Sequence, residues 1–222
     1  MDTRFKNVKV LIWDFDKTFY KPNVQLEKDI REAEYRVIRD RMGWDHTKTE
    51  EAFAQIYPST YRSATEAVAH ITRLTTAEAA AEMENHFDRT KYLTRDERLI
   101  TLFQKLTTYE HYILMNGYKP NVVKALDVLG LHPDLFREIV TSEAVGVNKP
   151  NHNGFAHILQ STKFDSDQHL MIGDRIAVDL APAKHLGMKT CWIHWNTALA
   201  DIDDSVVDIC VPTIYDVEQV LV

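Results

Sequence analysis

VKVLIWDFDKT, residues 8–18, is an apolar run that ends in two carboxylates one residue apart. A run rich in β-branched residues favours a strand that is buried on both faces, as the strands of parallel sheets are. Because alternate residues of a strand face the same way, Asp14 and Asp16 can point into one crevice. In open α/β sheets ligands bind at the carboxyl ends of the strands, so these two acids are candidate site residues.

The two carboxylates repel each other, so the pair calls for a cation or a shared proton. Mg²⁺ suits such a site because it prefers a few carboxylates together with substrate phosphate and water. One Asp could then attack an electrophile while the other transfers a proton. The structural alternative is that one carboxylate caps a following turn and the other is solvated.

WDFDKTFY, residues 13–20, resembles the first motif of the haloacid dehalogenase-like hydrolases, an apolar strand followed by DxDxT. The resemblance implies that Asp14 is the nucleophile and that Asp16 is the general acid and base. It also implies that Thr18 orients them and is a substrate-binding residue. The other motifs of the family should then follow downstream in a fixed order.

Length and composition describe an ordinary globular protein. The 222 residues allow one sizeable core domain with a smaller insertion, and 45% of them are hydrophobic. A net charge of -7 disfavours nucleic acid as the main partner. Neither an apolar signal segment nor a membrane-length apolar run is present in the sequence, so we expect a cytoplasmic protein without a membrane partner.

Hydrophobic periodicity divides the chain into two kinds of structure. From about Leu26 to Phe87 the period is helical, with helices expected over 26–42, 48–56, 59–74 and 76–87. From Arg95 onward helices alternate with short strands, expected at 112–115, 138–141, 170–172, 190–194 and 209–211. The alternation indicates βαβ units. We therefore predict an α/β fold: a Rossmann-like parallel sheet with helices on both faces, formed by residues 1–20 and 92–222, plus an inserted helical cap formed by residues 21–91.

The strand over 112–115 ends at Asn116-Gly117, where the family resemblance places the second motif. That motif ends its strand in Ser or Thr, whose hydroxyl binds the phosphoryl group together with nearby backbone amides. Met115 stands in this place, and a thioether cannot donate a hydrogen bond. Asn116 and Gly117 are therefore the predicted substrate-binding residues. Three alternatives follow for the missing hydroxyl donor: Asn116 supplies it, the backbone amides act alone, or the site is weakened. The loss of one such donor typically lowers the rate by about 10²–10³. Met115 itself is interpreted as a core residue.

Gly146-Val147-Asn148-Lys149-Pro150 resembles the third motif, a Lys just before a Pro in a loop that enters a helix. Lys149 is a candidate catalytic and substrate-binding residue because a point cation can neutralise a nucleophilic Asp and a phosphate oxygen together. In the helical insertion, Arg31, Arg62 and Arg73 could also reach a substrate, although a solvated helical face is the simpler interpretation.

GDRIAVD, residues 173–179, follows another apolar strand and resembles the fourth motif, GDxxxxD. Asp174 is expected to complete an oxygen shell around Mg²⁺ with Asp14 and the main-chain carbonyl of Asp16. Asp179, one turn further on, is expected to support metal-bound water or Lys149. The predicted metal site thus consists of Asp14, Asp16, Asp174 and Asp179.

The resemblance covers the whole chain and implies Mg²⁺-dependent hydrolysis of a small phosphate monoester, a sugar phosphate or a nucleotide monophosphate, through an aspartyl-phosphate. The second acid, Asp16, speaks against the dehalogenase branch of the family. Two alternatives remain. The first is a phosphotransferase or mutase on the same scaffold, and the second, given Met115, is a non-catalytic binding protein. The expected partner is a small phosphorylated metabolite, and the sequence carries no signal for the oligomeric state.

Overall fold

A computed structural model describes residues 3–60, 63–195 and 203–221. Within these residues a six-stranded sheet has the order β3-β2-β1-β4-β5-β6, and every neighbouring pair is parallel. The strands are β1 (Val10–Trp13), β2 (Glu110–Leu114), β3 (Glu138–Val140), β4 (His169–Gly173), β5 (Lys189–Ile193) and β6 (Ile209–Val211). The strand order reverses between β1 and β4, so the ligand crevice of such a sheet is expected beside β1.

The central strand β1 is buried on both faces, as its composition predicts. Its four residues are fully shielded from solvent. Leu11 and Trp13 pack into the apolar cluster on one face of the sheet, while Val10 and Ile12 pack into the cluster on the other face. A strand without a polar residue therefore holds the start of the candidate site in the middle of the protein.

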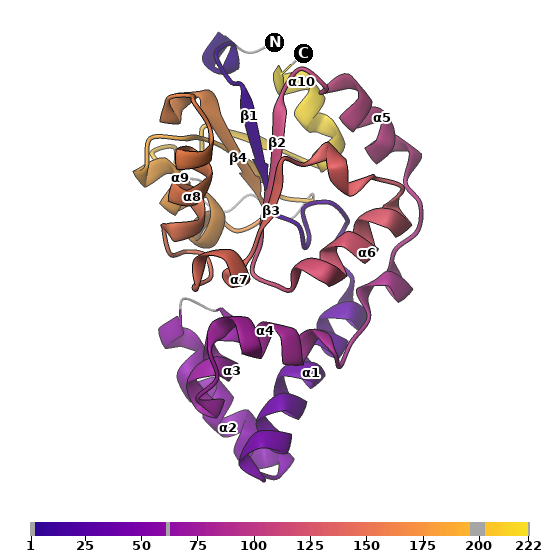
Figure 1. Cartoon of the computed structure of the whole chain (residues 1–222), viewed down its shortest axis with the longest axis vertical. Helices are drawn as coiled ribbons and strands as arrows, with labels where there is room; N and C mark the ends of the chain where they lie inside the picture. The colour runs from indigo at the N-terminus through magenta and orange to yellow at the C-terminus, as the bar shows by residue number, and fades with distance from the viewer. Residues whose placement is uncertain (1–2, 61–62, 196–202, 222) are drawn as a thin grey trace.

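Helices cover both faces of the sheet (Figure 1). One layer contains α5 (Glu97–Lys105), α6 (Lys119–Leu129) and α10 (Val217–Leu221), and the other contains α7 (Ser142–Val145), α8 (Asn153–Ser161) and α9 (Ala181–His185). The α/β Rossmann-like architecture predicted from strand–helix alternation is confirmed. After β4, residues Ile176–Leu180 form a π-helical turn, and α9 follows it with a Pro in its first turn.

Four helices are inserted between β1 and α5 and pack around an apolar cluster of their own. They are α1 (Val24–Met42), α2 (His46–Ile56), α3 (Ala64–Thr72) and α4 (Thr76–Glu84). Figure 1 shows them beyond the carboxyl ends of the strands. The inserted helical unit is confirmed, whereas its predicted limits at residues 21 and 91 stay a prediction. None of the described helices is both long and apolar enough to cross a membrane.

Local signals set the ends of these helices. The side chain of Asn23 accepts hydrogen bonds from the amides of Gln25 and Leu26 and begins α1. Gly43 ends it in the left-handed conformation with φ 67°, as expected for a C-terminal glycine. The third helix begins later than its expected start at residue 59, because Ser63 caps it and residues Tyr57–Thr60 form a separate 3₁₀ turn.

Candidate active site

Three acidic side chains meet at the carboxyl edge of the sheet. Trp13 of β1 is paired with Ile172 of β4, so Asp14 and Asp174 leave their strands at the same edge. Asp179 reaches the same place from the π-helical turn that follows β4. One carboxylate oxygen from each of Asp14, Asp174 and Asp179 lies within 4.8 Å of the other two. The structure thus brings together residues from two of the sequence motifs.

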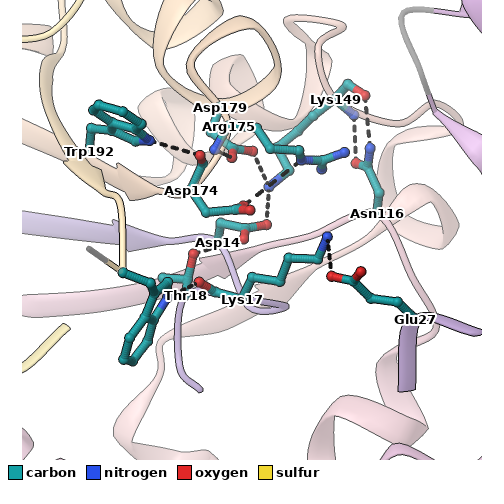
Figure 2. Close-up of polar contacts among 11 residues, drawn as sticks. Asp14, Lys17, Thr18, Glu27, Asn116, Lys149, Asp174, Arg175, Asp179 and Trp192 are labelled. Atoms are coloured by element: carbon teal, nitrogen blue, oxygen red, sulfur yellow. Dashed lines mark hydrogen bonds and ion pairs between the residues drawn. The ribbon is translucent and has the colours of Figure 1, made fainter. Parts of the chain in front are cut away.

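Lys149 lies between two of these carboxylates (Figure 2). Its Nζ is 2.6 Å from Oδ1 of Asp14 and 2.8 Å from Oδ1 of Asp179, and all three side chains are buried. Burial alone would lower the pKa of Lys149, but the charges of Asp14 and Asp179 outweigh it and raise that pKa. The ammonium therefore stays charged beside Asp14 at neutral pH.

Asp14 is held through both of its oxygens. Oδ1 faces Lys149, and Oδ2 accepts a hydrogen bond of 2.9 Å from the hydroxyl of Thr18. The loop between them turns at Lys17, which has a positive φ of 62°, and the indole of Trp195 donates to the Lys17 carbonyl. Burial raises the pKa of Asp14, while Lys149 opposes that shift. Thr18 is thus placed to orient Asp14, as its position in the first motif predicts.

Asn116 holds the main chain of Lys149. Its amide nitrogen donates to the Lys149 carbonyl at 2.8 Å, and its amide oxygen accepts from the Lys149 amide at 2.7 Å. One hydrogen of the Asn116 amide is therefore engaged by the protein rather than free for a substrate. Gly117 lies against Met115: a Cβ at residue 117 would come within 2.4 Å of the Met115 methyl. Met115 itself is buried in the core and also borders the cavity described below.

The donor set around Asp174 fits a hard divalent cation. Burial, followed by the charges of Asp14 and Asp179, raises the pKa of Asp174 to about 8. Its main-chain carbonyl accepts a hydrogen bond of 2.9 Å from Trp192, so the carboxylate is anchored through its own backbone. Carboxylate oxygens are the donors that Mg²⁺ prefers, and a cation among the buried Asp14 and Asp179 and the half-buried Asp174 would relieve their mutual repulsion.

Asp16 lies in different surroundings. Its Oδ1 accepts a hydrogen bond from the hydroxyl of Tyr20, and its Oδ2 is 3.7 Å from Nη2 of Arg89. Arg89 is 2% exposed and also donates to Glu84 at the end of α4. The Asp16 carboxylate is therefore outside the acidic cluster, and the predicted metal ligand at this residue is its main-chain carbonyl. Sequence reasoning assigned no role to Arg89 or Glu84, which belong to no motif.

A cavity of about 260 Å³ separates the sheet edge from the inserted helices. Asp14, Asp16 and Asp174 border it on the sheet side, and Arg31, Glu34 and Met83 border it on the helical side. Arg31 thus lines the site, contrary to the simpler interpretation of a solvated face. Arg73 is exposed, and Arg62 lies outside the described residues. The cavity is where a substrate can meet the buried carboxylates.

Comparison with known proteins identifies the family. Residues 11–193 match the family model of the haloacid dehalogenase-like hydrolases. The chain belongs to this family. The resemblance inferred from the four motifs is confirmed, and the chain is by family a hydrolase.

Curated relatives of this hydrolase align over part of their length. A glyceraldehyde 3-phosphate phosphatase from Pyrococcus abyssi is 37% identical over 63 residues, 28% of this chain and 26% of that protein. The pyrimidine 5'-nucleotidase YjjG from Escherichia coli is 36% identical over 83 residues, 37% of this chain and 36% of that protein. The chain therefore aligns with only about a quarter to a third of the length of these two relatives.

Solved structures resemble the whole chain. A haloacid dehalogenase-type phosphatase from Thermococcus onnurineus superposes with a TM-score of 0.66 at 20% identity, covering 96% of this chain and 97% of that one. An L-2-haloacid dehalogenase from Xanthobacter autotrophicus superposes with a TM-score of 0.59 at 15% identity, covering 96% and 98%. At these identities the likeness establishes the shared fold.

Proposed function

We propose that this hydrolase is a Mg²⁺-dependent phosphatase that acts on small phosphate monoesters through an aspartyl-phosphate at Asp14. The observation that carries the proposal is the buried contact of Asp14 with Lys149 and Thr18, beside Asp174 and at the border of a cavity. Relatives named as a glyceraldehyde 3-phosphate phosphatase and a pyrimidine 5'-nucleotidase support a phosphorylated metabolite as substrate. A cytoplasmic location, with neither nucleic acid nor membrane as partner, stays a prediction.

Two proton transfers and two displacements complete the reaction. An oxygen of Asp14 attacks phosphorus, forming one P–O bond while the bond to the leaving oxygen breaks, and Asp16 gives that oxygen a proton. Asp16 then takes a proton from water, which attacks the phosphorus of the aspartyl-phosphate and releases inorganic phosphate and free Asp14. Lys149 stabilises the negative charge that builds on the phosphoryl oxygens.

Of the four residues predicted for the metal site, Asp14, Asp16 and Asp174 would hold Mg²⁺ directly. The carboxylates of Asp14 and Asp174 and the main-chain carbonyl of Asp16 would be ligands, with Asp179 supporting Lys149 from behind. When bound, the ion supplies positive charge next to the phosphoryl group. Asn116 keeps the Lys149 loop in place, and Gly117 leaves room for the Met115 side chain at the edge of the cavity.

The inserted helices, residues 21–91, are proposed to act as a cap. They border the cavity opposite Asp14, so a substrate between the two parts would be shielded from bulk water. The cap would then select the leaving group while the sheet edge carries out the chemistry.

The test is the release of p-nitrophenol from p-nitrophenyl phosphate by the wild-type protein, with MgCl₂ and with EDTA, and by the Asp14→Asn variant. We expect Mg²⁺-dependent release with an equal amount of inorganic phosphate, and none from the variant. Because Met115 replaces a hydroxyl donor, a binding protein without turnover is the second candidate, and absence of release would favour it. Less phosphate than p-nitrophenol in the presence of a sugar acceptor would instead indicate a phosphotransferase.

A further inference from the structure

We propose that Glu34 recognises the leaving group of the substrate, and that this leaving group is a short carbon chain bearing hydroxyl groups. The inference rests on the proposed phosphatase function and narrows its substrate class to polyol and sugar phosphates. Glu34 lies on α1 of the inserted helices and borders the same cavity as Asp14 and Asp16. It therefore faces the space that a leaving group attached to a phosphoryl group at Asp14 would occupy.

The carboxylate of Glu34 has acceptor capacity that the protein does not use. Glu34 is 2% exposed, and its Oε2 lies 2.7 Å from Nη1 of Arg31. Among the described residues, Arg31 is the only polar side chain in contact with this carboxylate. An ionised carboxylate can accept about four hydrogen bonds, and burying one with few partners is costly. Because the Glu34 carboxylate has unused acceptor capacity beside a cavity, we infer that a ligand supplies the hydrogen-bond donor.

Arg31 is fixed by aromatic rings and so holds only one side of Glu34. Its guanidinium carbon lies 4.5 Å from the ring centre of Phe53 and 5.1 Å from that of Tyr57. Such cation–π contacts hold the guanidinium in one position. Oε2 of Glu34 is thus ion-paired with Arg31 but accepts no hydrogen bond among the described residues, so the carboxylate keeps acceptor capacity for a ligand.

The other residues of the inserted helices that line the cavity, called the helical wall, limit the chemistry of a ligand. Glu27 is paired with Lys17 at 2.9 Å, and Glu84 is paired with the buried Arg89. On the part of this wall that the structure describes, no cation is left without a carboxylate partner to receive a second anionic group of a substrate. The apolar residues of the wall include Ile30, Ala80, Met83 and Phe87. Tyr57, Ser63 and Thr65 add polar groups to the same lining. A few polar groups among apolar side chains fix the orientation of a ligand, and Glu34 is a buried one with unused acceptor capacity.

The size of the cavity favours a short chain. Its volume of about 260 Å³ lies below the ~300–1000 Å³ that is usual for small-molecule sites, and it must also admit the phosphoryl group. A leaving group of about three to five carbon atoms suits this space better than a nucleoside does. Hydroxyl groups on such a chain can donate hydrogen bonds to the carboxylate of Glu34.

The test compares hydroxylated and plain phosphates of equal chain length. The pairs are glycerol 3-phosphate with n-propyl phosphate, erythrose 4-phosphate with n-butyl phosphate, and ribose 5-phosphate with n-pentyl phosphate. Glu34→Gln removes the charge and one acceptor at constant size. Glu32→Gln on the same helix is the matched control, because Glu32 pairs with Arg39 outside the cavity.

For at least one pair we expect the wild-type protein to favour the hydroxylated member in kcat/KM, and Glu34→Gln to lower that preference about tenfold. The plain phosphates should change less than twofold, and Glu32→Gln should behave as the wild type. Equal losses for both members of each pair, or no loss of preference, would overturn the role of Glu34. A better rate with an amine such as phosphoethanolamine would overturn the hydroxyl assignment.

Binding to the Asp14→Asn variant separates recognition from turnover. Calorimetry with the same phosphates should give a tighter Kd for the hydroxylated member, and Asp14→Asn combined with Glu34→Gln should lose that difference. If the wild-type protein hydrolyses none of the phosphates, the proposed function fails. The Kd comparison then still decides whether Glu34 recognises hydroxyl groups, since equal Kd values for both members contradict it.

Discussion

The ammonium of Lys149 lies 2.6 Å from Oδ1 of Asp14, although the two residues stand 135 positions apart in the chain. The contact is buried, and the same ammonium reaches Asp179 at 2.8 Å. A charge placed in this way can stabilise both the nucleophile before attack and the phosphoryl oxygens during it. The pair therefore links the chemistry of the site to the packing of the two loops that carry it.

Replacing Lys149 should remove most of the activity. Lys149→Met keeps the length of the side chain but deletes its charge and donors, so kcat/KM for p-nitrophenyl phosphate should fall by at least about 10². Lys105→Met is the matched control, because Lys105 is exposed and pairs with Glu218 at 2.8 Å. A Lys149→Met protein with more than a tenth of the wild-type kcat/KM would contradict the assignment.

Removal of Mg²⁺ should reverse the sign of the effect that a substitution at Asp174 has on thermal stability. Burial and two neighbouring carboxylates raise the pKa of Asp174 from 3.8 to about 8, so its ionisation costs folding free energy that grows as the pH rises from about 4 through 8 and is complete at pH 9. In EDTA at pH 9, Asp174→Asn should therefore melt at a higher temperature than the wild-type protein. Saturating MgCl₂ should add roughly 2–3 kcal/mol to the wild-type protein, about 5–10 °C, and clearly less to the variant. Equal shifts in both proteins would contradict the proposed ligand.

Much of this site could be predicted because its residues follow strands with a strong pattern. Asp14 and Asp174 each end an apolar run, and parallel strands bring such ends to one edge. Lys149 has no periodic signal, and its placement depended on the family motif. Glu34 could not be predicted as a cavity residue. A lone acid on a helix has the same pattern whether it faces solvent or the sheet, and only the packing of the helices on the core decides.

The position of Met115 predicts a gain of function. Met115→Thr places a hydroxyl donor where the family's second motif has one, and we expect kcat/KM for p-nitrophenyl phosphate to rise about tenfold. In Met115→Val the new side chain has nearly the same shape as Thr but no hydroxyl, so kcat/KM should stay at the wild-type value. Both variants should lose about 1–3 kcal/mol of stability, because the buried methyl beside Gly117 is removed. Equal rates in the Thr and Val variants would show that backbone amides already serve the phosphoryl group.

The contact between Tyr20 and Asp16 predicts a dependence on the leaving group. The Tyr20 hydroxyl occupies Oδ1 of Asp16 and leaves Oδ2 for proton exchange with the leaving oxygen. Tyr20→Phe should lower kcat/KM for glycerol phosphate about tenfold, because an alkoxide needs a proton to leave. For p-nitrophenyl phosphate, whose phenolate leaves without one, the change should be within twofold.

Tyr92→Phe is the control for this comparison, because Tyr92 also donates to an Asp, Asp29 of α1, at 2.5 Å, outside the cavity. That variant should keep both rates. A Tyr20→Phe protein that loses the two activities in the same proportion would indicate a structural role for the hydroxyl.

The burial of Glu34 should lower the stability of the folded protein, a cost that we attribute to its role in ligand binding. Burial raises the pKa of Glu34 to about 7, with Arg31 opposing the shift. An acid whose folded pKa is raised stabilises the fold while it is protonated, and that contribution is lost as the pH rises from about 4.5 through 7. Glu34→Gln imitates the protonated form, so its melting temperature should exceed that of the wild-type protein at pH 8, with a smaller difference at pH 5. Thermal unfolding at the two pH values measures the difference, and a variant that melts at a lower temperature than the wild-type protein at pH 8 would refute it. A residue that weakens the fold at neutral pH and lines a cavity opposite Asp14 has the properties of a binding residue rather than of a structural one.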